Sequence, residues 1–212
     1  MNLIVIAKAP APGRSKTRLC PPCTPEQASA LAEAALADTL AAVVATSGVR
    51  RRVLALDGDP GPWVSAGFEV VPQRGGGLDE RLGAAFEDVG GPSLLVGMDT
   101  PQVTPALLGQ SIRALGSPGV DAVLGRAVDG GFWAIGLHEP DPAVFLGVPM
   151  SSARTAARQR ARLDALGLRV AGLPPLRDVD RIADGWAVAG LAPTSRFALA
   201  LREIHEPAGA MV

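Results

Sequence analysis

Four cationic side chains lie close together near the start of the chain, with no acidic residue between them: Lys8, Arg14, Lys16 and Arg18. Lysine and arginine donate charge-assisted hydrogen bonds to phosphate oxygens, and backbone amides of a loop can add to them. A solvated surface loop with ordinary charges is the alternative interpretation. The spacing G-x-x-x-x-G-K-[ST] is absent, so the segment is not a P-loop. The sequence favours a phosphate site here.

Acidic residues form a second set of candidates for chemistry. Asp99 directly follows the apolar run 93–97, and the carboxyl ends of strands are where open α/β sheets bind their ligands. It could instead cap a helix, although Thr104 is the better N-cap. Asp129 opens an Asp-Gly-Gly turn, which is either a plain hairpin turn or a place where a sugar or phosphate approaches. Asp178 and Asp180 could cap the last helices.

A glycine run at 75–77 follows Gln73 and precedes an expected helix. Glycines leave room for a ligand to approach the backbone, because no side chain blocks it. A flexible connector would have the same composition. Asp57 and Asp59, after the second apolar run, could be ligands, but we favour turn residues that bond to their own backbone.

These residues need a scaffold, and the apolar pattern predicts one of alternating strands and helices. We expect strands at 2–7, 52–56, 68–72, 93–97, 120–125, 132–137 and 168–173. We expect helices at 25–46, 78–88, 105–115 and 151–166, and a helical tail at 180–205 with a break near 190–193. Such alternation predicts an α/β three-layer sandwich with a mostly parallel, mixed sheet, in a single domain over 1–212.

The composition limits the classes of binding partner that we expect for this protein. The 212 residues carry a net charge of -1 and 48% hydrophobic side chains, so nothing points to nucleic acid or a membrane surface. We find no apolar run that predicts a membrane span and no signal-peptide pattern at the start, and we expect a cytoplasmic protein.

Two cysteines, Cys20 and Cys23, form a C-x-x-C pattern around two prolines. The only histidines, His138 and His205, are distant in sequence, so a zinc site is not indicated. A thioredoxin-type redox pair is the alternative to two incidental reduced cysteines, which we favour.

Taken in order, the motifs resemble those of the GT-A-like nucleotide-diphospho-sugar transferase superfamily, and within it the bacterial DUF2064, or transferase 1, family. Some members of that family are named arsenosugar-biosynthesis glycosyltransferases. The resemblance covers nearly the whole chain and rests on five stretches: residues 8–19, 73–81, 97–101, 125–131 and 178–180. The Gly-x-Asp-x-Pro stretch is also similar to that of molybdenum-cofactor and phospholactate guanylyltransferases.

The resemblance implies a GT-A or Rossmann-like fold with a nucleotide at the carboxyl edge of the sheet. It implies a Mg²⁺ or Mn²⁺ ion on Asp99 and Asp180, and catalytic roles for Lys16, Asp99 and Asp129. The nucleotide-binding residues that it implies are Lys8, Pro12, Gly13, Arg14, Lys16, Arg18, Gln73, Gly75, Gly76 and Arg81. The family continues Asp-Val-Asp with Thr-Pro-Glu-Asp, whereas Arg181 follows here, which weakens the assignment of Asp180.

Three functions fit this resemblance. The first is a glycosyltransferase that uses an NDP-sugar donor and a small-molecule acceptor. The second is a nucleotidyltransferase that couples an NTP to a phosphorylated small molecule and releases pyrophosphate, since four cations suit a triphosphate equally well. The third is a nucleotide-binding regulatory protein with a degenerate site. The acceptor, the base preference and the choice between a monomer and a homodimer stay open.

Overall fold

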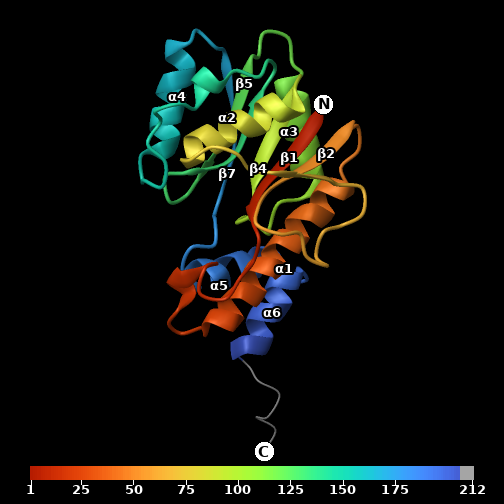
Figure 1. Cartoon of the computed structure of the whole chain (residues 1–212), viewed down its shortest axis with the longest axis vertical. Coiled ribbons are helices and arrows are strands. Elements are labelled where there is room, and N and C mark those ends of the chain that lie inside the picture. Colours follow the sequence, from red (N-terminus) through yellow and green to blue (C-terminus); the bar gives the residue numbers. More distant parts are fainter. Residues whose placement is uncertain (206–212) are drawn as a thin grey trace, which may run out of the picture.

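A single seven-stranded sheet forms the centre of the computed structural model, which describes residues 1–205 (Figure 1). Its strands are β1 Asn2–Lys8, β2 Arg51–Asp57, β3 Glu69–Pro72, β4 Ser93–Gly97, β5 Ala122–Ala127, β6 Phe132–Leu137 and β7 Val170–Leu176. They lie in the order β3-β2-β1-β4-β6-β5-β7. Only β6 runs antiparallel to its neighbours, β4 and β5, so the expected mostly parallel, mixed sheet is confirmed for the described residues.

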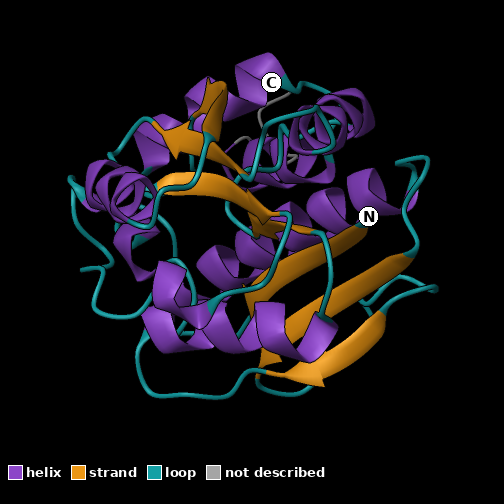
Figure 2. Ribbon diagram, turned by 90° about the horizontal axis from the view of Figure 1, so that it is seen from above, coloured by secondary structure: helices purple, strands orange, loops and turns teal. Residues whose placement is uncertain are grey.

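Helices cover both faces of the sheet (Figure 2). They are α1 Pro25–Val44, α2 Leu78–Val89, α3 Pro105–Leu115, α4 Thr155–Ala165, α5 Ile182–Leu191 and α6 Arg196–His205, with short 3₁₀ turns η1 Thr17–Leu19 and η2 Pro142–Val144. One hydrophobic core lies between the sheet and helices α1 and α3, and a second lies between the sheet and helices α2 and α4. The alternating sides of β1 illustrate this, because Leu3 and Val5 enter the first core and Ile4 the second.

A third, smaller core lies beyond the carboxyl edge of the sheet. There the first half of α1 packs against α5 and α6, and Leu19 and Val179 fill the space between them. Asp38 of α1 accepts hydrogen bonds from the backbone amides of Arg196 and Phe197 at 3.0 and 2.9 Å, which caps the start of α6. This core therefore ties the basic loop before α1 to the segment after β7.

The long helix α1 has an N-terminal capping box, in which Thr24 and Gln27 bond to each other's backbone. By length and composition alone this helix could cross a membrane, which the apolar pattern did not lead us to expect. Half of its most apolar window is buried inside the protein, in contact with β1 and α6. Its apolar character is thus explained by its position between two cores.

Candidate active site

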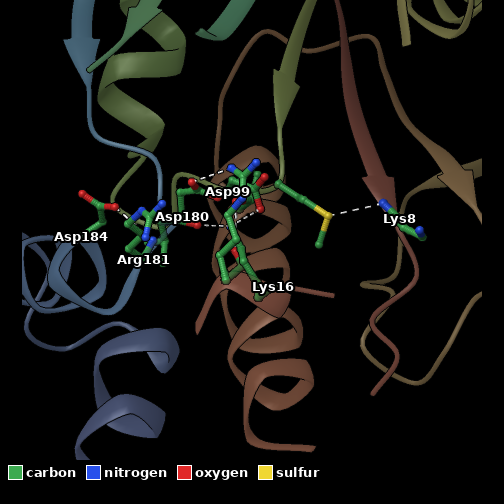
Figure 3. A network of polar contacts seen from close by, with 11 residues as sticks. Lys8, Lys16, Asp99, Asp180, Arg181 and Asp184 are labelled. Carbon is green, nitrogen blue, oxygen red and sulfur yellow. Dashed lines mark hydrogen bonds and ion pairs between the residues drawn. The ribbon is translucent and has the colours of Figure 1, made fainter. Parts of the chain in front are cut away.

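The basic loop after β1 meets the ends of two other elements at the carboxyl edge of the sheet (Figure 3). Lys16 lies in the left-handed region, with φ of 50°, and its side chain is only 10% exposed. Its ammonium nitrogen is 2.6 Å from Asp99 Oδ1 and also donates a hydrogen bond to the carbonyl oxygen of Val179. The loop, the end of β4 and the segment after β7 therefore share one cation.

A second ion pair and a backbone contact strengthen this junction. Arg18 lies 2.7 Å from Asp180 Oδ2, on the exposed side of the same loop. The Val179 amide donates to the Asp99 carbonyl oxygen at 2.9 Å. Asp180, the expected second metal ligand, therefore has Arg18 as its partner, while Asp99 has Lys16.

Asp178 is the carboxylate that the sequence analysis undervalued, since a helix cap explained it equally well there. Burial raises the pKa of Asp178 to about 6, and repulsion from Asp129 and Asp99 adds to this, while Lys16 opposes it. Asp178 thus lies close enough to Asp129 and Asp99 to be repelled by both, and close enough to Lys16 to be attracted by it. The burial of Asp178 comes from tertiary contacts of the loop after β7, which no local sequence pattern indicates.

Two cavities meet at Asp99. The smaller, about 360 Å³, is lined by the basic loop and its surroundings: Lys8, Arg14, Ser15, Lys16, Thr17, Arg18, Ala32, Met98, Asp99 and Asp180. The larger, about 610 Å³, runs along the carboxyl edge of the sheet from β2 to the start of α4. Lys8, Met98 and Asp99 line both cavities. All four predicted cations are therefore brought together in the smaller cavity.

One end of the larger cavity carries a polar array on an apolar floor. Arg81 Nη1 lies 2.9 Å from Asp57 Oδ2 and 3.4 Å from Gln73 Oε1. The Gln73 amide donates both of its hydrogens to backbone oxygens, of Ala7 at 2.7 Å and Ala55 at 3.0 Å. Gln73 and Arg81 are thus at the cavity as expected. Asp57, interpreted from sequence as a turn residue, lines it with them.

The glycines expected at the nucleotide are not among the lining residues of the two cavities in the described part of the chain. The Gly76 amide donates to Glu80 Oε2 at 2.6 Å. Gly75, with φ of 105°, forms the turn that makes this contact. Pro12 and Gly13 likewise shape the basic loop without lining either cavity in this part of the chain.

The opposite end of the larger cavity contains the hairpin turn between β5 and β6. Asp129 lines it, and its Oδ1 atom accepts a hydrogen bond from the Gly131 amide at 2.7 Å. Trp133 is nearly buried, and its indole nitrogen donates to the Pro174 carbonyl oxygen at 2.9 Å. The Asp-Gly-Gly turn is therefore both a hairpin turn and part of the cavity wall.

The cysteines lie apart from both cavities. Cys23 is buried, Cys20 is half-buried, and both are free thiols. Burial raises the pKa of the Cys23 thiol, and the neighbouring Cys20 adds to this. A raised pKa disfavours the thiolate that redox exchange requires. This agrees with the interpretation of Cys20 and Cys23 as two incidental reduced cysteines.

The carboxylates fit a divalent ion that is shared with a ligand better than one held by the protein alone. Within the described residues, no group of three or more His, Cys, Asp and Glu side chains is arranged to hold a metal. Mg²⁺ in nucleotide sites usually takes one or two carboxylates, several waters and substrate phosphate oxygens. Asp99, next to the cationic cavity, with Asp178 close by, meets that requirement.

Comparison with known proteins gives the family. The profile of DUF2064, described as an uncharacterized protein family conserved in bacteria, matches residues 30–152, more than half of the chain. The chain belongs to the DUF2064 family. No curated protein matches it in sequence.

Solved structures give the fold of this DUF2064 chain. A protein from Desulfovibrio desulfuricans G20, provisionally assigned as a nucleotide-diphospho-sugar transferase, is 25% identical with a TM-score of 0.84, over 96% of this chain and 95% of that one. CMP:2-keto-3-deoxy-manno-octonic acid synthetase in complex with CTP is 12% identical, with a TM-score of 0.58 over 91% and 98%. The 2-C-methyl-D-erythritol 4-phosphate cytidylyltransferase of Thermus thermophilus is 17% identical, with a TM-score of 0.54 over 94% and 99%. The expected superfamily and fold are confirmed.

Proposed function

We propose that the protein is a metal-dependent glycosyltransferase that transfers a sugar from an NDP-sugar to a small-molecule acceptor. The observation that carries this proposal is the junction of the two cavities at Asp99. A cationic cavity there opens into a larger one with separate polar groups at each end. A donor with a charged diphosphate between two uncharged ends matches this distribution of charge.

The diphosphate would lie in the smaller cavity, on the basic loop. Arg14 and Arg18 line it with exposed side chains, and Lys16 lies at its junction with Asp99. Lysine and arginine in such a site stabilise the charge that accumulates on a departing diphosphate. Lys16 already has an acidic partner, so the phosphates would compete with Asp99 for its ammonium group.

A Mg²⁺ or Mn²⁺ ion would be held by Asp99 and Asp178 together with the phosphates. When bound, such an ion neutralises the diphosphate charge and so assists its departure. Asp180 remains the alternative ligand, but it would first have to leave Arg18. Asp178 is the alternative that we favour, because burial raises its pKa, the nearby Asp129 and Asp99 add to this, and it has no ion-pair partner among the described residues.

The nucleobase would lie over Leu78 and Leu82 at the first end of the larger cavity. The Gln73 amide is engaged by the backbone there, so Asp57 and Arg81 are the groups left to recognise it. A carboxylate accepts a ring N–H, and a guanidinium donates to the adjacent carbonyl oxygen. This pair supports bases with that arrangement, guanine, uracil and thymine, over adenine and cytosine.

At the other end, Asp129 would accept the proton of the acceptor hydroxyl. The acceptor oxygen forms its bond to the anomeric carbon as the bond from that carbon to the phosphate oxygen breaks. The electron pair leaves with the nucleoside diphosphate, and the proton goes to Asp129 and then to solvent.

Product analysis tests this proposal. Incubation with a mixture of radiolabelled NDP-sugars, Mn²⁺ and a cell extract of small molecules should release a nucleoside diphosphate and no pyrophosphate. Lys16→Met should reduce that release by about a hundredfold or more, because one charge-assisted contact to the leaving group is lost. Release of pyrophosphate from NTPs instead would favour the second candidate, a nucleotidyltransferase, to which the fold shared with two such enzymes lends support.

A further inference from the structure

The end of the larger cavity away from Asp57 has its own composition, and we call it the acceptor end. It is formed by the β5–β6 turn, the start of β6 and the segment before α4. Its lining consists of Asp129, Gly131, Phe132, Trp133, Met150, Ser151, Ser152 and Thr155. This inference concerns what the acceptor end can bind, and it rests on the proposed function.

The walls of the acceptor end are locked together. The Ala156 amide donates to the Gly130 carbonyl oxygen at 2.9 Å. A Cβ atom on Gly130 would lie 2.0 Å from the Ala153 carbonyl oxygen, so only glycine permits this approach. Thr155, which is buried, accepts from the Ser152 amide and donates to the Pro149 carbonyl oxygen, both at 3.1 Å. Such contacts make a preformed site.

The charge at this end is negative. Within residues 1–205, no lysine or arginine is among its lining residues. The cations elsewhere in the larger cavity are Lys8, which also lines the phosphate side, and Arg81, which is paired with Asp57. Asp129 itself lies near the carboxylate of Asp178. A phosphate ester entering here would meet the carboxylate of Asp129, with no cationic side chain among the lining residues of this end within residues 1–205.

Three amides at the start of α4 are engaged by the protein itself. A helix N-terminus binds anions through its free amides. Here the Thr155 amide donates to the Ser152 carbonyl oxygen, and the Ala156 amide to that of Gly130. The Arg154 amide donates to the Ser152 hydroxyl oxygen at 3.1 Å. These groups are used inside the protein.

The remaining polar groups suit hydroxyls. Asp129 Oδ1 accepts from Gly131, which leaves Oδ2 to accept from a ligand. The Ser152 oxygen accepts from Arg154, so its own O–H remains available to donate. The half-buried ring of Phe132 and the side chain of Met150 add apolar surface. We propose that the acceptor is an uncharged compound with several hydroxyls, such as a polyol or a free sugar, and that phosphorylated acceptors are excluded.

Matched pairs of acceptors test this proposal. The probes are glycerol, glucose, ribose and mannitol, each beside its monophosphate, with the protein saturated in the NDP-sugar and Mn²⁺. We expect nucleoside diphosphate to be released about tenfold or more faster with each neutral acceptor than with its monophosphate. Repulsion between the phosphate and Asp129 should weaken binding of the monophosphate by at least that factor. Calorimetric titration of the same pairs into the protein with bound NDP should show the same order.

A charge variant makes the result specific to the acceptor end. Ser152→Arg should admit the phosphorylated member of a pair and weaken the neutral one, whereas Glu139→Gln, at a position outside both cavities, should change neither. A wild-type preference for the phosphates, or no response to any neutral probe, would overturn the acceptor proposal while NDP-sugar binding stands. Loss of NDP-sugar binding itself would instead defeat the proposed function.

Discussion

Lys16 holds the central position at the scale of single residues. Its left-handed backbone and its contacts to Asp99 and Val179 place one ammonium group at the junction of the two cavities. Such a backbone conformation is costly for a residue other than glycine and is found mainly at functional sites. Under the proposed function, Lys16 would take the place of the metal cation beside Asp99 until a phosphate draws it away.

Asp99→Asn should reduce metal-dependent turnover by about a hundredfold or more. The amide keeps the shape of the side chain but loses the charge that a hard cation requires. The fold should remain, since the Lys16–Asp99 pair involves a half-exposed carboxylate and contributes about 1 kcal/mol or less. Turnover and thermal unfolding of the variant measure the two effects, with Glu139→Gln as control. Unchanged turnover would contradict the role of Asp99.

The raised pKa of Asp178 predicts how the free energy of unfolding depends on pH. Its carboxyl ionises near pH 3.8 in the unfolded chain and near 6 in the folded one, so the folded state binds the extra proton between these values. The free energy of unfolding should thus fall as pH rises from about 4 to 6 and stay lower above that range. Asp178→Asn should remove this fall and raise the free energy of unfolding at pH 7.5 by about 1 to 2 kcal/mol.

Denaturant titrations of both proteins across that pH range provide the measurement. If Asp178 also binds the metal, Mn²⁺ with an NDP-sugar should stabilise the wild-type protein more than Asp178→Asn, because binding requires the ionised carboxylate. Parallel pH curves for the two proteins would refute the assignment.

At the scale of elements, the site depends on how segments that are distant in sequence meet. The β5–β6 turn packs directly onto the start of α4 through Gly130, and the segment after β7 is tied to the end of β4 through Val179. These contacts fix Asp129, Asp178 and Asp99 near one another. A change at either contact should therefore affect the chemistry without touching a charged group.

Gly130→Ala tests this coupling. The new Cβ atom would clash with the Ala153 carbonyl oxygen, and φ of 96° is unfavourable for alanine. We expect a loss of stability of about 2 kcal/mol and a marked loss of turnover, since backbone must move at the acceptor end. Gly190→Ala is the matched control, because it adds a Cβ in open space within α5 and should be neutral or slightly stabilising. Equal behaviour of the two variants in unfolding and turnover assays would argue against the coupling.

Local patterns predicted the elements well, because each depends on its own residues. The apolar run of β1, the capping box at Thr24 and the Asp-Gly-Gly turn all have the structures that they predicted. Several boundaries moved: β5 and β7 begin two residues later than expected, α1 ends two residues earlier, and α4 begins at Thr155. Residues 151 and 152, expected in that helix, line the acceptor end instead.

Side-chain partners could not be predicted from these patterns, because they depend on tertiary contacts. The pairing of Asp57 with Arg81, and of Asp180 with Arg18, joins residues from different elements. The engagement of Gln73 by two neighbouring strands is another example. The cations of the basic loop were predictable because they are adjacent in sequence.

At the scale of the whole molecule, the sheet order places β1 and β4 at its centre, with the two cavities over their carboxyl ends. The strands on one side carry the groups proposed for the base, and those on the other carry the acceptor end. Asp99, on the boundary, belongs to both. Binding of the diphosphate and of the metal should consequently be coupled through Lys16 and Asp99.

Metal removal measures that coupling. With EDTA, the affinity for an NDP-sugar should fall by about tenfold or more. Without the metal cation between them, the Asp99 carboxylate repels the phosphates. The affinity for the nucleoside without phosphates should be unaffected. An equal effect of EDTA on both ligands would contradict a shared metal.

The most direct test of the central claim is a calorimetric titration of the wild-type protein with matched NDP-sugars, NDPs and NTPs, each with Mn²⁺ and with EDTA. The account predicts tight, metal-dependent binding of an NDP-sugar that carries guanine, uracil or thymine, in preference to the NTP of the same base. Preference for an NTP, or no binding of any of these ligands, would contradict it.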